Sequence, residues 1–144
     1  MTTAIEPPLV LVLPPRAYPS KRAVIEAIGD LMIGAAAVTP AYVDGMLRKE
    51  IESSTIVTAD VALPHGTADV RAAVLRNVLV VAPIPGALEW QPDRHVRLAI
   101  GFAGTGDQAH LRLLATVARV LEDDRLIARL IAGSDTASLA ALFA

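Results

Sequence analysis

The chain has 144 residues, of which 53% are hydrophobic, a length and composition that fit one domain, spanning residues 1–144, with a core of its own. The formal net charge is −2 and only 3% of the residues are aromatic, so the basic excess and the stacking side chains that favour nucleic-acid binding are both missing. Because there is no cysteine, disulfides, thiolate nucleophiles and cysteine metal sites are excluded, which is compatible with a reducing compartment.

The first 15 residues predict an N-terminal arm or edge strand. Their apolar stretch, Leu9 to Leu13, lies between two proline pairs, which suit the edge of a sheet. It is too short for a signal peptide and follows Glu6 instead of a basic region. No apolar run approaches the roughly 18 residues that span a bilayer. We therefore expect a cytoplasmic protein with no direct membrane insertion.

Two helices are predicted next. The first runs from an N-cap at Ser20 to about Ala37 and has an apolar stripe at helical spacing, made of Val24, Ala27, Ile28, Leu31 and Ala35. The second begins with Thr39 as N-cap and Pro40 at the first helical position, where the missing N–H costs nothing. Its inward residues are expected to be Tyr42, Met46 and Leu47. It ends in Arg48, Lys49 and Glu50, a cluster that is typical of a solvated helix end.

A polar loop, residues 53–60, leads into the stretch Val61 to Thr67. Its apolar run predicts a short buried strand that stops at Pro64, because proline cannot donate to a sheet ladder. His65 follows directly, and Gly66 lets the backbone turn closely beneath the side chain. The pattern therefore presents one imidazole at a strand end.

The remaining elements alternate between strands and helices. Residues 68–75 predict a turn or short helix, and 77–82 a central strand that residues 83–86 end. Residues 88–90 predict a short hairpin or edge piece, and 95–102 another strand, followed by a turn over 104–107. The alternation predicts an α/β fold in one layered domain.

Three further helices complete the predicted elements. Asp107 is a suitable N-cap for a helix to about Glu122, whose buried stripe is expected to be Leu111, Leu114, Ala118 and Leu121. Asp123 or Asp124 begins a short helix that continues through Ala132, and Ser134 caps a last one.

The three histidines differ in their surroundings. His95 stands at a predicted strand start between charged residues, which favours a surface or capping role. His65 and His110 stand at junctions that lead into helices, and such junctions line the ligand-binding crevice of parallel α/β sheets. The positive end of a helix dipole there favours a neutral imidazole and a nearby anion.

Two histidines in such a site suit a phosphoryl group, with one imidazole as nucleophile and the other as a donor to the phosphoryl oxygens. Zinc is the rival interpretation, but the sequence has no His-x-x-x-His pair, cysteine or tight His/Asp cluster to complete a site, so no metal is expected. A serine-hydrolase triad is disfavoured because there is no Gly-x-Ser-x-Gly elbow.

Ala62-Leu-Pro-His-Gly-Thr67 resembles the active-site signature of the mannitol/fructose-type IIA components of the bacterial phosphoenolpyruvate-dependent sugar phosphotransferase system, the PTS EIIA type-2 domains. The segment from Val96 through Gly104-Thr-Gly-Asp to His110-Leu111 resembles that family's second signature, in which a strand leads into a helix with a second active-site histidine. Arg125-Leu-Ile-Ala-Arg-Leu130 and the last helix resemble its C-terminal pair, so the similarity spans about residues 16–144.

This resemblance implies a mixed, mostly parallel sheet with helices on both faces. It also implies that His65 takes a phosphoryl group on Nε2 from the phosphohistidine of the carrier protein HPr and passes it to a cysteine of a IIB domain. His110 would stabilise the group in transfer, and Thr67 could donate to it through its hydroxyl and backbone. No cofactor would be needed, since transfer between histidines requires mainly positioning and charge stabilisation. The motif forms resemble the mannitol branch most.

Two departures from the family pattern bear on the site. The arginine that usually precedes the glutamate at the end of the second helix is Lys49 here, with Arg48 before it. Either residue could supply a cation that supports the phosphoryl group, but a lysine is a point charge without the planar fork of arginine. The usual approach loop has three glycines and a glutamate that are absent between Ser54 and Ala62. Asp60 could replace the carboxylate, but a shift of one residue in a strand reverses the face to which it points.

Two alternatives to sugar uptake stay open on the sequence. One is a regulatory, nitrogen-type IIA-like module that is phosphorylated as a signal and controls its partners by contact. The other is a relic domain that keeps the fold without efficient transfer, which the altered loop and Lys49 would allow.

Overall fold

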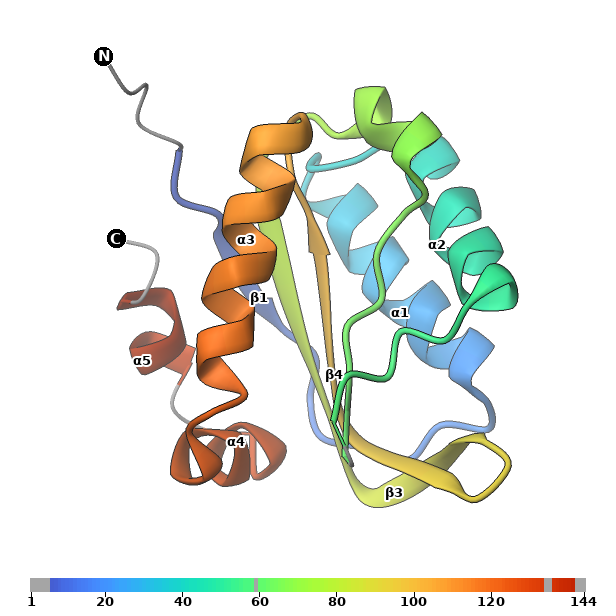
Figure 1. The fold of residues 1–144 in the computed structure, drawn as a ribbon, viewed down its shortest axis with the longest axis vertical. Helices are drawn as coiled ribbons and strands as arrows, with labels where there is room; N and C mark the ends of the chain where they lie inside the picture. The colour runs from blue at the N-terminus through green and yellow to red at the C-terminus, as the bar shows by residue number, and fades with distance from the viewer. Residues whose placement is uncertain (1–5, 59, 134–135, 142–144) are drawn as a thin grey trace.

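The computed structural model describes residues 6–58, 60–133 and 136–141. Within these residues four strands form one mixed sheet with helices on both faces (Figure 1). The strands and helices are β1 (Leu9–Val12), α1 (Lys21–Gly34), α2 (Pro40–Glu52), β2 (Val61–Ala62), the 3₁₀ helix η1 (Ala68–Ala73), β3 (Val78–Gln91), β4 (Arg94–Ala103), α3 (Asp107–Val120), α4 (Asp124–Ile131) and α5 (Thr136–Ala141). The predicted α/β class is confirmed.

The strand order β1-β3-β4-β2 brings together strands that are far apart in sequence. The outer pairs, β1 with β3 and β2 with β4, are parallel, and the central pair, β3 with β4, is antiparallel. In β2, Val61 and Ala62 lie opposite Leu98 and Ala99 of β4. Because β2 and β4 are parallel neighbours, their carboxyl ends meet at the same edge of the sheet.

Strand β3 is longer than the sequence predicts. The expected end at residues 83–86 is wrong, because β3 continues to Gln91 and forms a long hairpin with β4. Two features accommodate the prolines. The register with β4 shifts between Pro83 and Leu88, and the paired part of β1 ends opposite Val81, so this part of β3 lies beyond the neighbouring strand.

Several predicted helix boundaries agree with the structure. The Ser20 hydroxyl accepts a hydrogen bond from the Ala23 N–H as N-cap of α1, which ends at Gly34, and the Asp123 carboxylate accepts one from the Leu126 N–H at the start of α4. Thr39 is the N-cap residue of α2, but its side chain makes no capping hydrogen bond. Residues 1–5, part of the expected arm, and Ser134, the expected cap of the last helix, lie outside the described residues.

The buried face of α3 differs from the predicted stripe. The helix begins at Asp107, so that Gly106, with a φ of 95°, is its N-cap instead of Asp107. Leu111 and Ala118 are exposed, whereas Leu114 and Leu121, the other two residues of the predicted stripe, are partly buried against the core. The fully buried residues are Ala109, His110, Leu113, Thr116, Val117 and Val120. The prediction followed the leucines, whereas the helix buries two polar side chains, His110 and Thr116.

The sheet separates two hydrophobic cores. Helices α1 and α2 cover one face, and α3, α4 and α5 cover the other (Figure 1). Alternate residues of β3 enter the two cores: Val78 and Val80 pack on the side of α1, and Leu79 and Val81 on the side of α3. Burial on both faces explains why residues 78–82 are a continuous apolar run.

Candidate functional site

His65 and His110 lie together at one edge of the sheet. His65 follows β2, and His110 is in the first turn of α3, directly after β4. Their ring centroids are 5.5 Å apart, and the Phe102 ring lies 5.0 Å from that of His65 and 5.2 Å from that of His110. The parallel pairing of β2 with β4 therefore brings the two predicted imidazoles into one site. His95 is exposed near the opposite end of β4, across from Glu89.

A backbone hydrogen bond fixes the tautomer of His65. Its Nδ1 lies 2.7 Å from the Leu63 carbonyl oxygen. Because a carbonyl can only accept, Nδ1 carries the proton and donates it, and the lone pair of the neutral ring is on Nε2. Nε2 is therefore the nitrogen that can act as a nucleophile.

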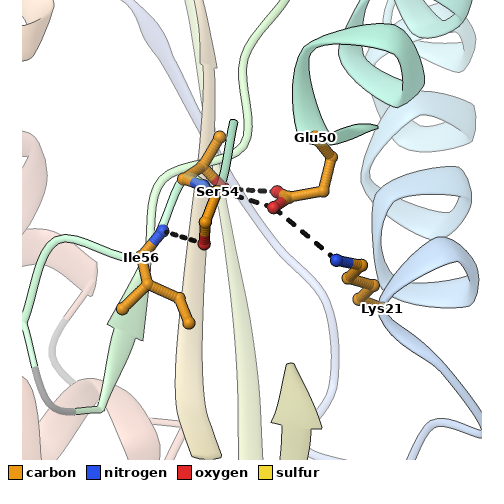
Figure 2. A network of polar contacts seen from close by, with 5 residues as sticks. Lys21, Glu50, Ser54 and Ile56 are labelled. Atoms are coloured by element: carbon orange, nitrogen blue, oxygen red, sulfur yellow. Dashed lines mark hydrogen bonds and ion pairs between the residues drawn. The ribbon is translucent and has the colours of Figure 1, made fainter. Parts of the chain in front are cut away.

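A buried carboxylate anchors the loop behind His65. Glu50 Oε1 accepts from the Thr55 hydroxyl at 2.6 Å, and Oε2 accepts from the Thr55 N–H at 3.2 Å. Lys21 Nζ lies 4.0 Å from Oε2 on the other side of Glu50 (Figure 2). The Thr55 carbonyl in turn accepts from the Leu63 N–H at 2.9 Å, and the Leu63 carbonyl accepts from His65. Hydrogen bonds thus connect Glu50 to the imidazole through two residues.

The approach loop that precedes β2 folds back and pairs with that strand. Ile56 forms an antiparallel bridge with Ala62, and the Val57 N–H donates to the Val61 carbonyl at 3.0 Å. Within the loop the Ser54 hydroxyl accepts from the Ile56 N–H at 3.2 Å (Figure 2). These bonds hold the segment in place without the glycines that the family pattern has.

Tyr42 ties the residue after His65 to the neighbouring strand. Its hydroxyl donates to the Phe102 carbonyl at 2.8 Å and accepts from the Gly66 N–H at 3.0 Å. Burial raises the pKa of the Tyr42 hydroxyl to about 12, so that it remains a neutral donor. A Cβ on Gly66 would lie 2.7 Å from the Tyr42 ring, which explains why glycine is required there.

The predicted supporting residues occupy different positions around the histidines. Lys49 is half-buried at the end of α2. Arg48 is exposed and forms an ion pair with Asp69, at 3.2 Å. The Thr67 hydroxyl oxygen is buried on the side of α2, 3.3 Å from the position that a Cβ on Gly45 would take.

Both histidines are held in the neutral form. Burial lowers the pKa of His65, the charges of Lys49 and Arg71 lower it further, and the hydrogen bond to Leu63 and the charge of Glu50 act in the opposite direction. Burial, followed by the charge of Arg71, lowers the pKa of His110 to about 4. At neutral pH the site therefore presents a free nucleophilic nitrogen and a second ring that can donate an N–H.

Asp60 does not take part in the site. Its carboxylate accepts from Arg97 at 3.0 Å, and its carbonyl accepts from the Arg97 and Leu98 N–H groups at the start of β2. His65 lies beyond the other end of that strand. The carboxylate that the hydrogen-bond network connects to His65 is that of Glu50.

Three residues at the site were not predicted to act there. Tyr42 was expected only to face inward, and Glu50 was grouped with a solvated helix end. The burial of Glu50 could have been predicted from its spacing. Tyr42, Met46 and Glu50 recur every four residues and therefore share one buried face of α2. Arg71 lies in η1, whose helical form the sequence left open, so no periodicity indicated its direction.

The described residues hold no group of three or more histidine, cysteine, aspartate or glutamate side chains that could bind a metal ion. In the same part of the chain, none of the helices has the length and apolar character needed to cross a membrane.

Comparison with known proteins places the chain in a family. Residues 10–144 match the family model for the phosphoenolpyruvate-dependent sugar phosphotransferase system, EIIA 2. The chain belongs to this family. As a type-2 EIIA chain it is a carrier component of the phosphotransferase system, and mannitol-specific proteins are among its relatives.

Two relatives illustrate the range of the EIIA 2 family. The mannitol-specific phosphotransferase enzyme IIA component of Bacillus subtilis is 30% identical over 124 residues, which are 86% of this chain and 86% of that protein. The multiphosphoryl transfer protein of Salmonella typhimurium is 35% identical over 123 residues, 85% of this chain. The chain spans only 32% of the length of that longer relative.

Solved structures agree with the EIIA 2 fold. The crystal structure of IIA mannitol from Escherichia coli superposes with a TM-score of 0.79, at 26% identity, and covers 92% of this chain and 95% of that one. The complex of enzyme IIA mannitol with phosphorylated enzyme IIB mannitol, also from Escherichia coli, gives a TM-score of 0.80 at 24% identity, with 92% of each chain covered.

Proposed function

We propose that this chain is a mannitol-like phosphocarrier that accepts a phosphoryl group from phospho-HPr on His65 and passes it to a IIB cysteine for sugar uptake and phosphorylation. The observation that carries the proposal is the pair of neutral imidazoles of His65 and His110. Their ring centroids lie 5.5 Å apart, at the carboxyl ends of adjacent parallel strands. A cytoplasmic location is part of the same proposal.

In the first step His65 Nε2 attacks the phosphorus of the donor phosphohistidine. A new N–P bond forms at Nε2 while the N–P bond of the donor breaks, and the donor imidazole leaves as a neutral ring with the electron pair. The hydrogen bond from Nδ1 to the Leu63 carbonyl keeps the nucleophilic lone pair on Nε2 and supports the positive charge that the ring gains on phosphorylation.

In the second step the thiolate of the IIB cysteine attacks the same phosphorus. An S–P bond forms, the N–P bond to His65 breaks, and the ring returns to its neutral form. His110 supports both steps by donating an N–H to a phosphoryl oxygen. The low pKa of His110, about 4, means that it donates without first losing or gaining a proton at neutral pH.

The proposal is tested by incubating the chain with phosphoenolpyruvate, enzyme I and HPr and measuring intact mass. We expect one acid-labile phosphoryl group on the wild type and none on His65→Ala. His110→Ala should keep the fold and accept the group about 100-fold more slowly, the size of effect that follows loss of one preorganised donor. His95→Ala, which removes the exposed histidine, is the matched control and should behave as wild type.

Three outcomes would count against the proposal. A wild-type chain that takes up no acid-labile phosphate would favour the relic domain, and labelling of His65→Ala would remove the assignment of the nucleophile. If the wild type is labelled but transfers nothing to any IIB protein, a regulatory module that is phosphorylated as a signal becomes the better interpretation.

A further inference from the structure

Arg71 connects the two segments that carry the histidines. It lies in η1, six residues after His65, and its guanidinium forms an ion pair with Asp107, in the first turn of α3 three residues before His110. The arginine side chain is 24% exposed, whereas that of Asp107 is 83% exposed. The guanidinium therefore lies on the inner side of this pair.

The charge of Arg71 acts on three titratable groups at the site. Its charge adds to the effect of burial in lowering the pKa of His65 and of His110, and it partly opposes the larger effect of burial that raises the pKa of the Tyr42 hydroxyl. These three groups come from different parts of the chain, so the half-buried guanidinium is close enough to act on all of them.

One donor of Arg71 has no acceptor. Its Nε is buried and makes no hydrogen bond within the described residues, although a terminal nitrogen of the same guanidinium is bound to Asp107. A buried N–H without an acceptor costs free energy, and a phosphoryl oxygen next to His65 would remove that cost. A guanidinium has five donors in a fixed plane, so it can bind Asp107 and an oxyanion at once.

The other two cations are less suited to this task. Arg48 is exposed and already bound to Asp69. Lys49 is half-buried and lowers the pKa of both histidines, but an ammonium group has no planar fork. Arg71 is thus the cation at the site that combines burial, a free donor and planar geometry.

We propose that Arg71 binds the phosphoryl group carried by His65, donating from Nε to a phosphoryl oxygen, and that Asp107 positions its guanidinium. This inference rests on the proposed phosphocarrier function and adds a residue to it. Charge on the transferring oxygens is stabilised by the cation, and the ion pair with Asp107 keeps the guanidinium in place before the phosphoryl group arrives.

The test measures single-turnover transfer from phospho-HPr to the full chain in Arg71→Gln, Arg71→Lys and Asp107→Asn. We expect losses of about 100-fold, about 10-fold and a few-fold, respectively, because lysine keeps the charge without the fork and the last variant only loosens the guanidinium. Arg119→Gln, at the far end of α3, is the matched control and should transfer at the wild-type rate. Thermal unfolding of each variant separates loss of transfer from loss of fold.

A second measurement follows the Nε–H resonance of Arg71 by NMR before and after phosphorylation of the wild type. It should move downfield on phosphorylation, while that of Arg48 stays in place. If the wild type is phosphorylated but the resonance does not move, or Arg71→Gln transfers at the wild-type rate, the role of Arg71 is refuted and the phosphocarrier function is not. A wild type that accepts no phosphoryl group overturns both.

Discussion

His65 is held by hydrogen bonds, whereas His110 is held by packing. The His65 ring donates to Leu63, and the residue after it donates to Tyr42. The described residues contain no hydrogen bond to the His110 ring, which packs against the Phe102 and His65 rings in the first turn of α3. The difference matches two chemical tasks: a nucleophile needs one nitrogen fixed as a donor, and a ring that must donate to an arriving phosphoryl oxygen needs an N–H that is still available.

The largest expected loss of stability comes from disturbing the packing that holds His110, at Gly104. A Cβ there would lie 2.6 Å from the His110 backbone nitrogen and 2.8 Å from its Cα, so the start of α3 would have to move. We expect Gly104→Ala to lower the free energy of unfolding by about 3 kcal/mol, measured by urea denaturation, and to slow phosphoryl transfer.

Gly86→Ala is the matched control, because a Cβ at Gly86 meets no atom within 4 Å. Equal stability of the two variants would mean that the His110 segment tolerates displacement and that packing does not fix the ring.

Tyr42→Phe tests the hydrogen bonds that hold the segment of His65. The substitution keeps the ring but leaves the Phe102 carbonyl and the Gly66 N–H without their partner, which should lower the free energy of unfolding by about 2 kcal/mol. Tyr18→Phe is the control, since the buried Tyr18 hydroxyl has no hydrogen-bond partner in the described residues. A loss no larger than that of the control would show that Tyr42 does not hold the loop.

Acid should lower the stability of the fold through protonation of His110. In the unfolded chain His110 takes up a proton near pH 6.5, but in the folded chain its pKa is about 4. Its contribution to stability is therefore complete above pH 6.5 and is lost as the pH falls toward 4, by about 1–2 kcal/mol after allowance for solvent screening. His110→Gln should reduce this pH dependence in denaturation curves, and an unchanged slope would contradict it.

The smallest expected effect is that of Glu50→Gln. The amide can still accept from Thr55 but loses its charge, so we expect a loss of about 1 kcal/mol in the free energy of unfolding. Because the charge of Glu50 raises the pKa of His65, NMR titration should show that pKa moving lower. Glu52→Gln, an exposed change on the same helix, should leave it in place, and identical titrations in the two variants would remove Glu50 from the network.

The sequence predicted the positions of the two histidines better than the contacts that hold them. The strand-end motifs fixed where His65 and His110 stand relative to β2 and β4, and parallel pairing then brings them together. Several hydrogen bonds of the site are accepted by backbone carbonyls, which carry no residue-specific signal; the carbonyls are those of Leu63, Thr55 and Phe102. Gly66 was predicted to allow a close turn, but only the structure identifies the Tyr42 ring as the neighbour that requires it.

Two wrong predictions about the fold have the same cause. Both follow from local sequence patterns, whereas tertiary contacts determine the structure at these positions. Prolines at 83 and 85 were expected to end a strand, but they lie where β3 runs past the paired residues of β1. The leucine stripe of α3 was chosen over a face that includes His110 and Thr116, because burial of polar side chains cannot be predicted from hydrophobic periodicity alone.

The strand order also has a consequence for folding kinetics. The central pair, β3 and β4, is a hairpin of neighbours in sequence, so it closes a short loop, whereas β2 pairs with β4 across a long one. Strand β2 is two residues long and lies at the sheet edge. We expect its amides to exchange with solvent sooner than those of the hairpin, because local opening there breaks few bonds. His65 thus follows a short edge strand that we expect to open readily, while His110 follows the hairpin that closes the shorter loop.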